Sequence, residues 1–171
     1  MPTKTTKLRI EDVTLEVLSG EVQQTALDFI SYLRKNSINP AWLATNAWKI
    51  TYKTFTVCFI RLHGAAENYG IEEGAWQVIP LIGEHETDDL PDDLREIVWA
   101  NIKVCANCGK CALKLKTVFG KKFDYACEKC IVFNSPEEVE IHCIKKLIEL
   151  RRSQIAEGRA KKHVYVPYRD R

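Results

Sequence analysis

The apolar positions of this chain follow one period over the first twenty residues and another over the next sixteen. Alternation of apolar and polar side chains at Leu8, Ile10 and 13–17 predicts one or two short strands, or an extended arm, within residues 1–20. From residue 21 onward apolar side chains recur three and four positions apart, which predicts a helix over 21–36 with one apolar face. The residues of that face are Val22, Ala26, Phe29, Ile30 and Leu33.

The next block has the composition and the period of β-structure. Residues 48–53 alternate apolar and polar side chains, and residues 55–62 are rich in aromatic and β-branched types. Only two residues separate these segments, so the pattern predicts a β-hairpin. Residues 75–82 are predicted to form a third strand, which Pro80 confines to a sheet edge or a bulge because proline has no N–H to donate.

Helical periodicity returns twice in the second half of the chain. Acidic residues at the head of a predicted helix over 91–103 suit the positive end of the helix dipole. The last helix is predicted over 136–152. It begins with a capping box in which Ser135 caps the helix, Pro136 takes the first helical position and Glu138 follows three residues after the serine.

The order of these elements predicts an α+β fold. Strands from residues 48–82 form an antiparallel sheet, and the three helices pack on one of its faces. The chain has 171 residues, of which 46% are hydrophobic and 28% charged, which is enough for one domain with its own core. We expect that domain to span residues 21–152, with a Cys-rich insertion at 104–131 and a basic tail over 153–171.

Seven cysteines, five of them between residues 105 and 130, bear on both location and chemistry. The first residues lack the apolar core of a secretory signal, and the longest apolar stretches fall far short of the ~20 residues that cross a bilayer. We therefore expect a cytoplasmic protein without membrane contact. In such a protein, clustered cysteines bind metal or carry redox chemistry rather than forming a disulfide framework.

Two CxxC pairs, Cys105/Cys108 and Cys127/Cys130, are separated by 18 residues, a spacing typical of two-knuckle zinc sites. Two thiolates three positions apart on a tight turn converge on one ion, and two such turns complete a tetrahedron with Zn–S distances near ~2.3 Å. A predicted hairpin over 113–125 joins the two pairs, as in a zinc ribbon. Four thiolates leave no open position on the metal, so the spacing predicts a structural zinc.

Cys111 leaves the ligand set open. It forms a second CxxC with Cys108 and precedes Cys127 by 15 intervening residues, so it is an alternative zinc ligand. Cys105, Cys108 and Cys111 together with a later cysteine would also suit an iron–sulfur cluster, although residues 112–115 lack the usual fourth cysteine. Free or disulfide-forming thiols are a third interpretation.

The other candidate side chains favour packing over chemistry. Cys58 lies in an apolar strand and Cys143 on the apolar face of the last helix, so both are predicted to be core residues. His142 is predicted to be a surface histidine. The chain contains no motif for a nucleophilic, phosphate-binding or zinc-protease site, so we assign no catalytic residue and lean toward a protein that is not an enzyme.

The charge is balanced overall and uneven locally. The formal net charge is +2, from 25 basic and 23 acidic residues. Six lysines and no acid lie between Ile97 and Phe123, and seven basic residues face two acids over 151–171. Lysine-rich knuckles and a basic tail are one basis for nucleic-acid binding. A zinc tetrathiolate, with its formal charge of −2, would however attract the same lysines without any partner.

Part of the chain resembles a group of uncharacterised small bacterial proteins. The resemblance lies in residues 117–127, followed by 132–137 and 145–151, and in a β-block that contains tryptophan and lysine at 46–53. It covers about residues 21–152. It implies a helix, this β-block and a Cys-rich insertion before the last helix in a domain of unknown function, and it brings no established activity.

We therefore expect a structural zinc that holds residues 105–130 rigid and presents a surface to a small ligand or a macromolecular partner. An iron–sulfur or thiol redox protein and a nucleic-acid-binding zinc-ribbon protein are the two alternatives.

Overall fold

The computed structural model describes residues 8–65, 70–82, 90–103, 116–124 and 130–162. Their largest element is a five-stranded sheet with the strand order β1-β2-β3-β4-β7, in which every neighbouring pair is antiparallel. This confirms the predicted antiparallel sheet and extends it by two strands. The strands are β1 (Asn39–Ala44), β2 (Ala47–Tyr52), β3 (Phe55–Leu62), β4 (Trp76–Pro80) and β7 (Phe133–Asn134).

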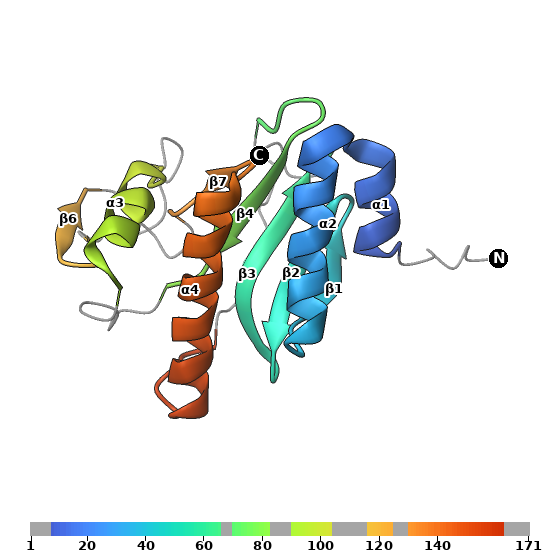
Figure 1. Cartoon of the computed structure of the whole chain (residues 1–171). Coiled ribbons are helices and arrows are strands. Elements are labelled where there is room, and N and C mark those ends of the chain that lie inside the picture. Colours follow the sequence, from blue (N-terminus) through green and yellow to red (C-terminus); the bar gives the residue numbers. More distant parts are fainter. Residues whose placement is uncertain (1–7, 66–69, 83–89, 104–115, 125–129, 163–171) are drawn as a thin grey trace, which may run out of the picture.

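Helices cover one face of this sheet. Helices α2 and α4 run across it, α1 lies beside α2, and α3 lies on the far side of α4 next to the small β5–β6 hairpin (Figure 1). This arrangement confirms the predicted α+β architecture. The elements are α1 (Ile10–Val17), α2 (Gly20–Lys35), α3 (Asp92–Ala100), α4 (Glu138–Ala156), β5 (Lys116–Val118) and β6 (Lys121–Phe123).

The main core lies between the helices and the sheet, where large apolar side chains exclude water. Trp48 of β2 and Trp76 of β4 are 2% and 0% exposed, and the Phe29 ring of α2 lies 6.1 Å from that of Trp76. Burying an aromatic side chain of this size stabilises a fold by several kcal/mol at about 25 cal/mol per Å². Cys58, in β3, is fully buried in this core, as the sequence predicted.

The opposite face of the sheet is also buried at its centre. Phe59, Ile79 and Leu81 form a second apolar cluster, with Leu43 and Val132 packed against it. Strand β3 is therefore enclosed on both sides, which explains why its sequence is an almost continuous apolar run rather than a strict alternation.

The predicted hairpin of β2 and β3 is confirmed. Its two turn residues, Lys53 and Thr54, have φ angles of +49° and +78°. Two consecutive positive φ values define the turn whose twist matches a two-residue hairpin. The sequence lacks the usual Asn-Gly at this turn, so the pairing of Tyr52 with Phe55 and of the longer strands beyond must hold the strained turn in place.

Pro80 lies in an interior strand but at a local edge. Strand β4 pairs with β3 along its length, whereas β7 pairs only with Gln77 and Val78. The N–H of Leu81 donates to the carbonyl of Val57, so the nitrogen of Pro80 faces away from β3, beyond the end of β7. The missing N–H therefore costs no ladder bond.

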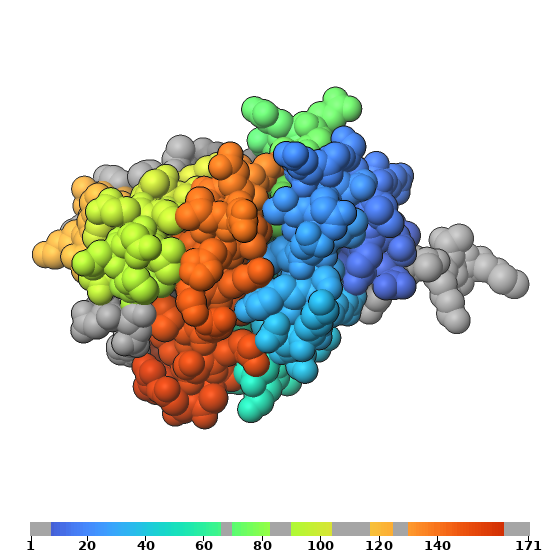
Figure 2. Space-filling view, in the orientation of Figure 1, coloured from blue at the N-terminus to red at the C-terminus, as the bar shows by residue number. Residues whose placement is uncertain are grey.

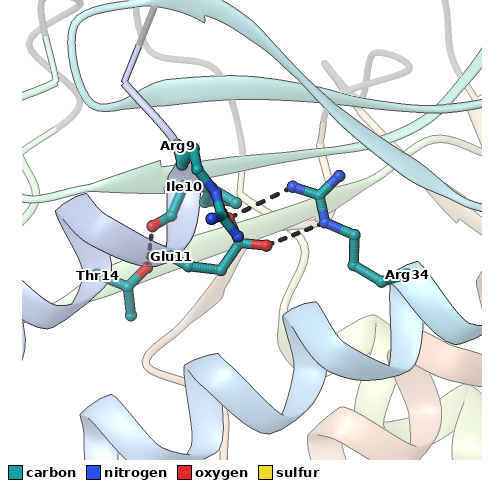
Figure 3. Close-up of polar contacts among 5 residues, drawn as sticks. All are labelled: Arg9, Ile10, Glu11, Thr14 and Arg34. Atoms are coloured by element: carbon teal, nitrogen blue, oxygen red, sulfur yellow. Dashed lines mark hydrogen bonds and ion pairs between the residues drawn. The ribbon is translucent and has the colours of Figure 1, made fainter.

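One sequence prediction near the N-terminus is wrong, and one strand was not predicted. Residues 10–17 form a helix rather than strands, because Ile10, Val13 and Thr14 share one helical face and that face is buried, while Leu15 is 56% exposed. The buried hydroxyl of Thr14 donates to the carbonyl of Ile10 at 2.7 Å (Figure 3). Strand β1 has a weak sequence signal, because Asn39 and Pro40 at its start are residues typical of helix ends and turns.

The start of the last helix is also corrected. Its N-cap is Glu137, and the capping box joins Glu137 to Glu140, whose side chain accepts from the backbone N–H of Glu137 at 3.1 Å. Ser135 is used by the sheet instead: its N–H donates to the carbonyl of Trp76 at 2.7 Å, and its hydroxyl lies 3.3 Å from the N–H of Trp76. The helix continues to Ala156, so the basic tail predicted from residue 153 begins later.

A bidentate contact fixes α1 to α2 (Figure 3). Arg34 donates from Nε to Oε1 of Glu11 at 3.0 Å and from Nη2 to Oε2 at 3.3 Å, and Nε of Arg9 lies 3.6 Å from Glu11 Oε2. Partial burial raises the pKa of Glu11. The hydrogen bond from Arg34 and the positive charges of Arg34 and Arg9 outweigh that effect, so the net pKa is lowered.

We predict that Glu11→Gln destabilises the protein at pH 7 and that the effect fades in acid. The folded pKa of Glu11 lies below its ordinary value of 4.5, so the stabilisation is fully present above 4.5 and is lost as pH falls through the folded value. Urea unfolding of both proteins across this pH range measures the difference. Glu16→Gln, at an exposed position of the same helix, is the control. A pH-independent difference would contradict the prediction.

Candidate metal centre

One of the predicted zinc ligands falls within the described residues. Cys130 is 2% exposed and directly precedes Ile131, which is fully buried. The other predicted ligands, Cys105, Cys108 and Cys127, and the alternative ligand Cys111 lie outside the described residues. Within the described ranges, no three His, Cys, Asp or Glu side chains form a group that could hold a metal ion. The predicted ligand set therefore stays a prediction.

The residues at the two ends of the Cys-rich segment are hydrogen-bonded to each other. The N–H of Lys103 donates to the carbonyl of Cys130 at 2.7 Å, and the N–H of Val132 donates to the backbone carbonyl of Asn101 at 2.9 Å. Between these bonds, Ile102 and Ile131 form an antiparallel bridge. The exit of α3 is thus paired with the residues that follow the second CxxC.

Residues 130–135, which we call the return segment, then join this exit to the sheet. Phe133 and Asn134 pair with Val78 and Gln77 of β4, and the amide of Gln77 donates to Asn134 Oδ1 at 2.7 Å. Phe133 is fully buried. The return segment is therefore hydrogen-bonded to α3 at its beginning and to β4 at its end, and α4 starts directly after it.

Asn101 adds a side-chain link between the exit of α3 and α4. Its amide nitrogen donates to the carbonyl of Ile97 at 2.9 Å and to Oε1 of Glu140 at 3.1 Å. Glu140 also closes the capping box of α4. The first turn of α4 is thereby tied to the place where the Cys-rich segment begins.

The β5–β6 hairpin is a second fixed point within the Cys-rich insertion. Val118 and Phe119 are each 1% exposed, and the indole N–H of Trp99 in α3 donates to the carbonyl of Val118 at 2.8 Å. The predicted hairpin is confirmed over residues 116–123. Its turn lies at Phe119 and Gly120, which have φ angles of +45° and +86°.

The two cysteines outside the insertion do not suit metal binding. Burial raises the pKa of the Cys143 thiol to about 12, with further contributions from the charges of Glu140 and Asp93. Burial also raises the pKa of the Cys58 thiol well above its ordinary value. Both thiols are therefore protonated at neutral pH, whereas metal ligation requires the thiolate. Cys143 Sγ lies 3.6 Å from the carbonyl of Leu94. The predicted packing roles of both residues are confirmed, and His142 is exposed as predicted.

Comparison with known proteins does not place the chain in a family: no family model, curated protein or solved structure matches it. The structure thus defines its class by architecture, as an α+β protein with helices on one face of an antiparallel sheet. No helix in the described part of the chain is both long and apolar enough to cross a bilayer.

Sequence reasoning missed the role of Trp99. The apolar residues at helical spacing in and after α3 are Leu94, Ile97, Val98 and Ile102, and Trp99 lies outside this stripe. The structure shows Trp99 half-buried against the hairpin, with Lys121 Nζ 5.1 Å from its ring. A tryptophan beside the apolar stripe of a short helix, just before a Cys-rich segment, was the only available signal.

We predict that Trp99→Phe loosens the hairpin without disturbing the sheet. The phenyl ring keeps much of the packing, but the carbonyl of Val118 loses its donor, which costs about 1 kcal/mol in the free energy of unfolding. Hydrogen–deuterium exchange should rise in β5 and β6, and urea unfolding measures the energy. Trp42→Phe, at a position that is 39% exposed, is the control. Unchanged exchange in the hairpin would show that the indole hydrogen bond contributes nothing.

Proposed function

We propose that this chain is a zinc-binding protein whose zinc is structural and whose Cys-rich insertion presents a surface to a small ligand or a macromolecular partner. The proposed ligands are Cys105, Cys108, Cys127 and Cys130, with Cys111 as the alternative. The observation that carries the proposal is the pairing of Lys103 with Cys130, because it brings the two ends of the Cys-rich segment together.

Covalent connectivity limits how far the proposed ligands lie from this pair. Cys105 follows Lys103 by two positions, and an extended chain advances ~3.3–3.6 Å per residue, so its Cα lies within about 7 Å of that of Lys103. Cys127 precedes Cys130 by three positions, which limits their Cα atoms to about 11 Å. One end of each CxxC pair is therefore tethered near the Lys103–Cys130 pair, which is compatible with a shared ion.

The hairpin supports the same arrangement from the other side. Residues 104–115 and 125–129 both run between the Lys103–Cys130 pair and the β5–β6 hairpin, which Trp99 holds against α3. Two segments of the chain that share both end points can contribute ligands to one site. Zinc binding would contribute to the free energy of folding and would thereby stabilise one conformation of the insertion.

The chemistry of the donor set favours zinc in a structural role. Four thiolates close the coordination sphere, so the metal would have no position for water or substrate. The formal charge of −2 on such a centre would be offset by lysines; Lys103, Lys121 and Lys122 are all exposed around the insertion. An iron–sulfur cluster or a thiol redox site would use the same cysteines, and the metal content distinguishes them.

We predict about one zinc per chain in colourless protein purified without an affinity tag or added metal. Cys130→Ser should lose most of the zinc and melt at a lower temperature, because it removes a ligand from the start of the return segment. Elemental analysis, a visible spectrum and thermal unfolding measure these effects. Cys143→Ser is the matched control, since it is equally buried and its hydroxyl can donate to the carbonyl of Leu94.

Three outcomes would contradict the proposal. Iron with acid-labile sulfide and a brown colour would assign the cysteines to a cluster, and absence of any metal would assign them to thiol chemistry. Chelation that leaves the melting temperature unchanged would show that the metal has no structural role.

A further inference from the structure

We propose that a basic surface at the C-terminal end of α4 binds the phosphodiester backbone of nucleic acid without sequence preference. We call it the basic end. The last turns of α4 and the β2–β3 turn lie at the same end of the molecule (Figure 1) and adjoin on its surface (Figure 2). Its residues come from that turn, from α4 and from the segment after α4: Lys53, Arg151, Arg152, Lys161 and Lys162.

The segment after α4 is held in place rather than loose. Gly158 has a φ of +71°, and the N–H groups of Arg159 and Ala160 both donate to the carbonyl of Gln154, at 2.9 and 3.2 Å. This is a helix C-terminus closed by a left-handed glycine, which turns the chain back along the helix. The cations of residues 161–162 are thereby placed beside those of α4.

Three of the cations are positioned by aromatic rings. Arg152 lies 4.7 Å and Lys53 lies 5.6 Å from the ring of Tyr52, and Lys162 lies 5.6 Å from the ring of Phe55. Tyr52 and Phe55 are paired across the β2–β3 turn. Each cation–π contact contributes about 0.5–1 kcal/mol at an exposed site, so the rings hold the charges close together despite their mutual repulsion.

Arg151 is the least compensated charge of the basic end. It is 5% exposed, and its Nη2 donates to the backbone carbonyl of Lys161 at 2.7 Å. Its Nε is buried without a hydrogen-bond partner, and no carboxylate pairs with it among the described residues. A buried guanidinium that lacks a counter-charge raises the positive potential at this end of the molecule, which favours an anion beside it.

The acids nearest in sequence do not neutralise this surface. Glu149 is paired with Lys146 at 3.0 Å, and Glu157 accepts from Arg159 at 2.6 Å. Lys53, Arg151, Arg152 and Lys162 thus supply positive charge from three separate segments. Such a spread of charge suits a polyanion better than a single small phosphate.

Nucleic acid fits this surface better than a lipid bilayer. The exposed large apolar side chains of the described residues are Leu8, Leu15, Trp42 and Val139, none of which belongs to the basic end, so the surface offers no apolar anchor to a membrane. Cations already cover the rings of Tyr52 and Phe55, so bases have no free ring to stack on. Recognition would therefore be of the phosphate backbone.

Binding of the full-length protein to a dye-labelled 20-base-pair duplex, followed by fluorescence anisotropy over a range of salt concentrations, tests the proposal. We expect affinity to fall steeply with salt, since each neutralised phosphate releases counterions. The double variant Lys53→Gln, Lys162→Gln should weaken binding roughly tenfold at low salt. It should also reduce the slope of log K against log salt concentration by about 2. Duplexes of different sequence should bind alike.

The control is Lys121→Gln with Lys122→Gln, which removes the same charge from exposed positions of β6. It should change affinity little. An equal or larger loss in this control would overturn the proposal and assign binding to the Cys-rich insertion. Absence of duplex binding, or binding only to phosphatidylserine vesicles, would also overturn it. No proposed zinc ligand lies in the basic end, so the variant with Lys53→Gln and Lys162→Gln should keep its zinc, and either proposal can fail alone.

Discussion

The placement of α4 depends on the short return segment, residues 130–135. These residues pair backbone to backbone with the exit of α3 and then with β4, and α4 begins immediately afterwards. Burial of Ile131 and Phe133 keeps water away from these bonds, where a broken hydrogen bond is most costly. Helix α4 supplies much of the cover for the sheet, so the main core depends on six residues of extended chain.

Because of the position of Cys130, the proposed metal would act directly on the return segment. Cys130 is the first residue of the return segment, and its carbonyl accepts the hydrogen bond that closes the base of the Cys-rich segment. A metal bound there would restrain the beginning of a run whose end carries α4. A long insertion in the middle of a domain raises the entropy of the unfolded chain, and a metal that ties its ends together offsets part of that cost.

The sequence predicted elements whose stabilising contacts are local and missed those whose contacts are distant. Helix α2 and the β2–β3 hairpin follow from their own periodicity. The N-terminal helix was assigned to strands because its eight residues fit both periods, and the choice rests on burial of Ile10 and Val13 against the rest of the fold. Strand β7 has only two residues. Ser135 and Pro136 match the pattern of a helix start. The sequence carries no signal that Ser135 instead pairs with Trp76, 59 positions away.

The same distinction applies to the candidate site. Spacing alone identified the cysteines, since CxxC geometry is local. Spacing could not show that Cys130 is buried and paired with Lys103, or that Trp99 holds the hairpin, because both contacts join residues that are far apart in the sequence. The thiols of Cys58 and Cys143 were correctly assigned to the core because an apolar surrounding sequence already predicts burial.

Helix α4 separates two regions of distinct charge, the proposed zinc site and the basic end, which the small net charge of the chain does not reveal. The helix begins beside the exit of α3, where Asn101 contacts Glu140, and carries Arg151 and Arg152 of the basic end in its second half, before it ends at Ala156. At 1.5 Å per residue, the 11 positions from Glu140 to Arg151 correspond to about 16 Å along the helix axis. This distance exceeds the ~8 Å screening length at physiological salt, so charge at the proposed zinc site has little direct influence on anion binding at the basic end. Any link between them must therefore be mechanical, through the position of α4 itself.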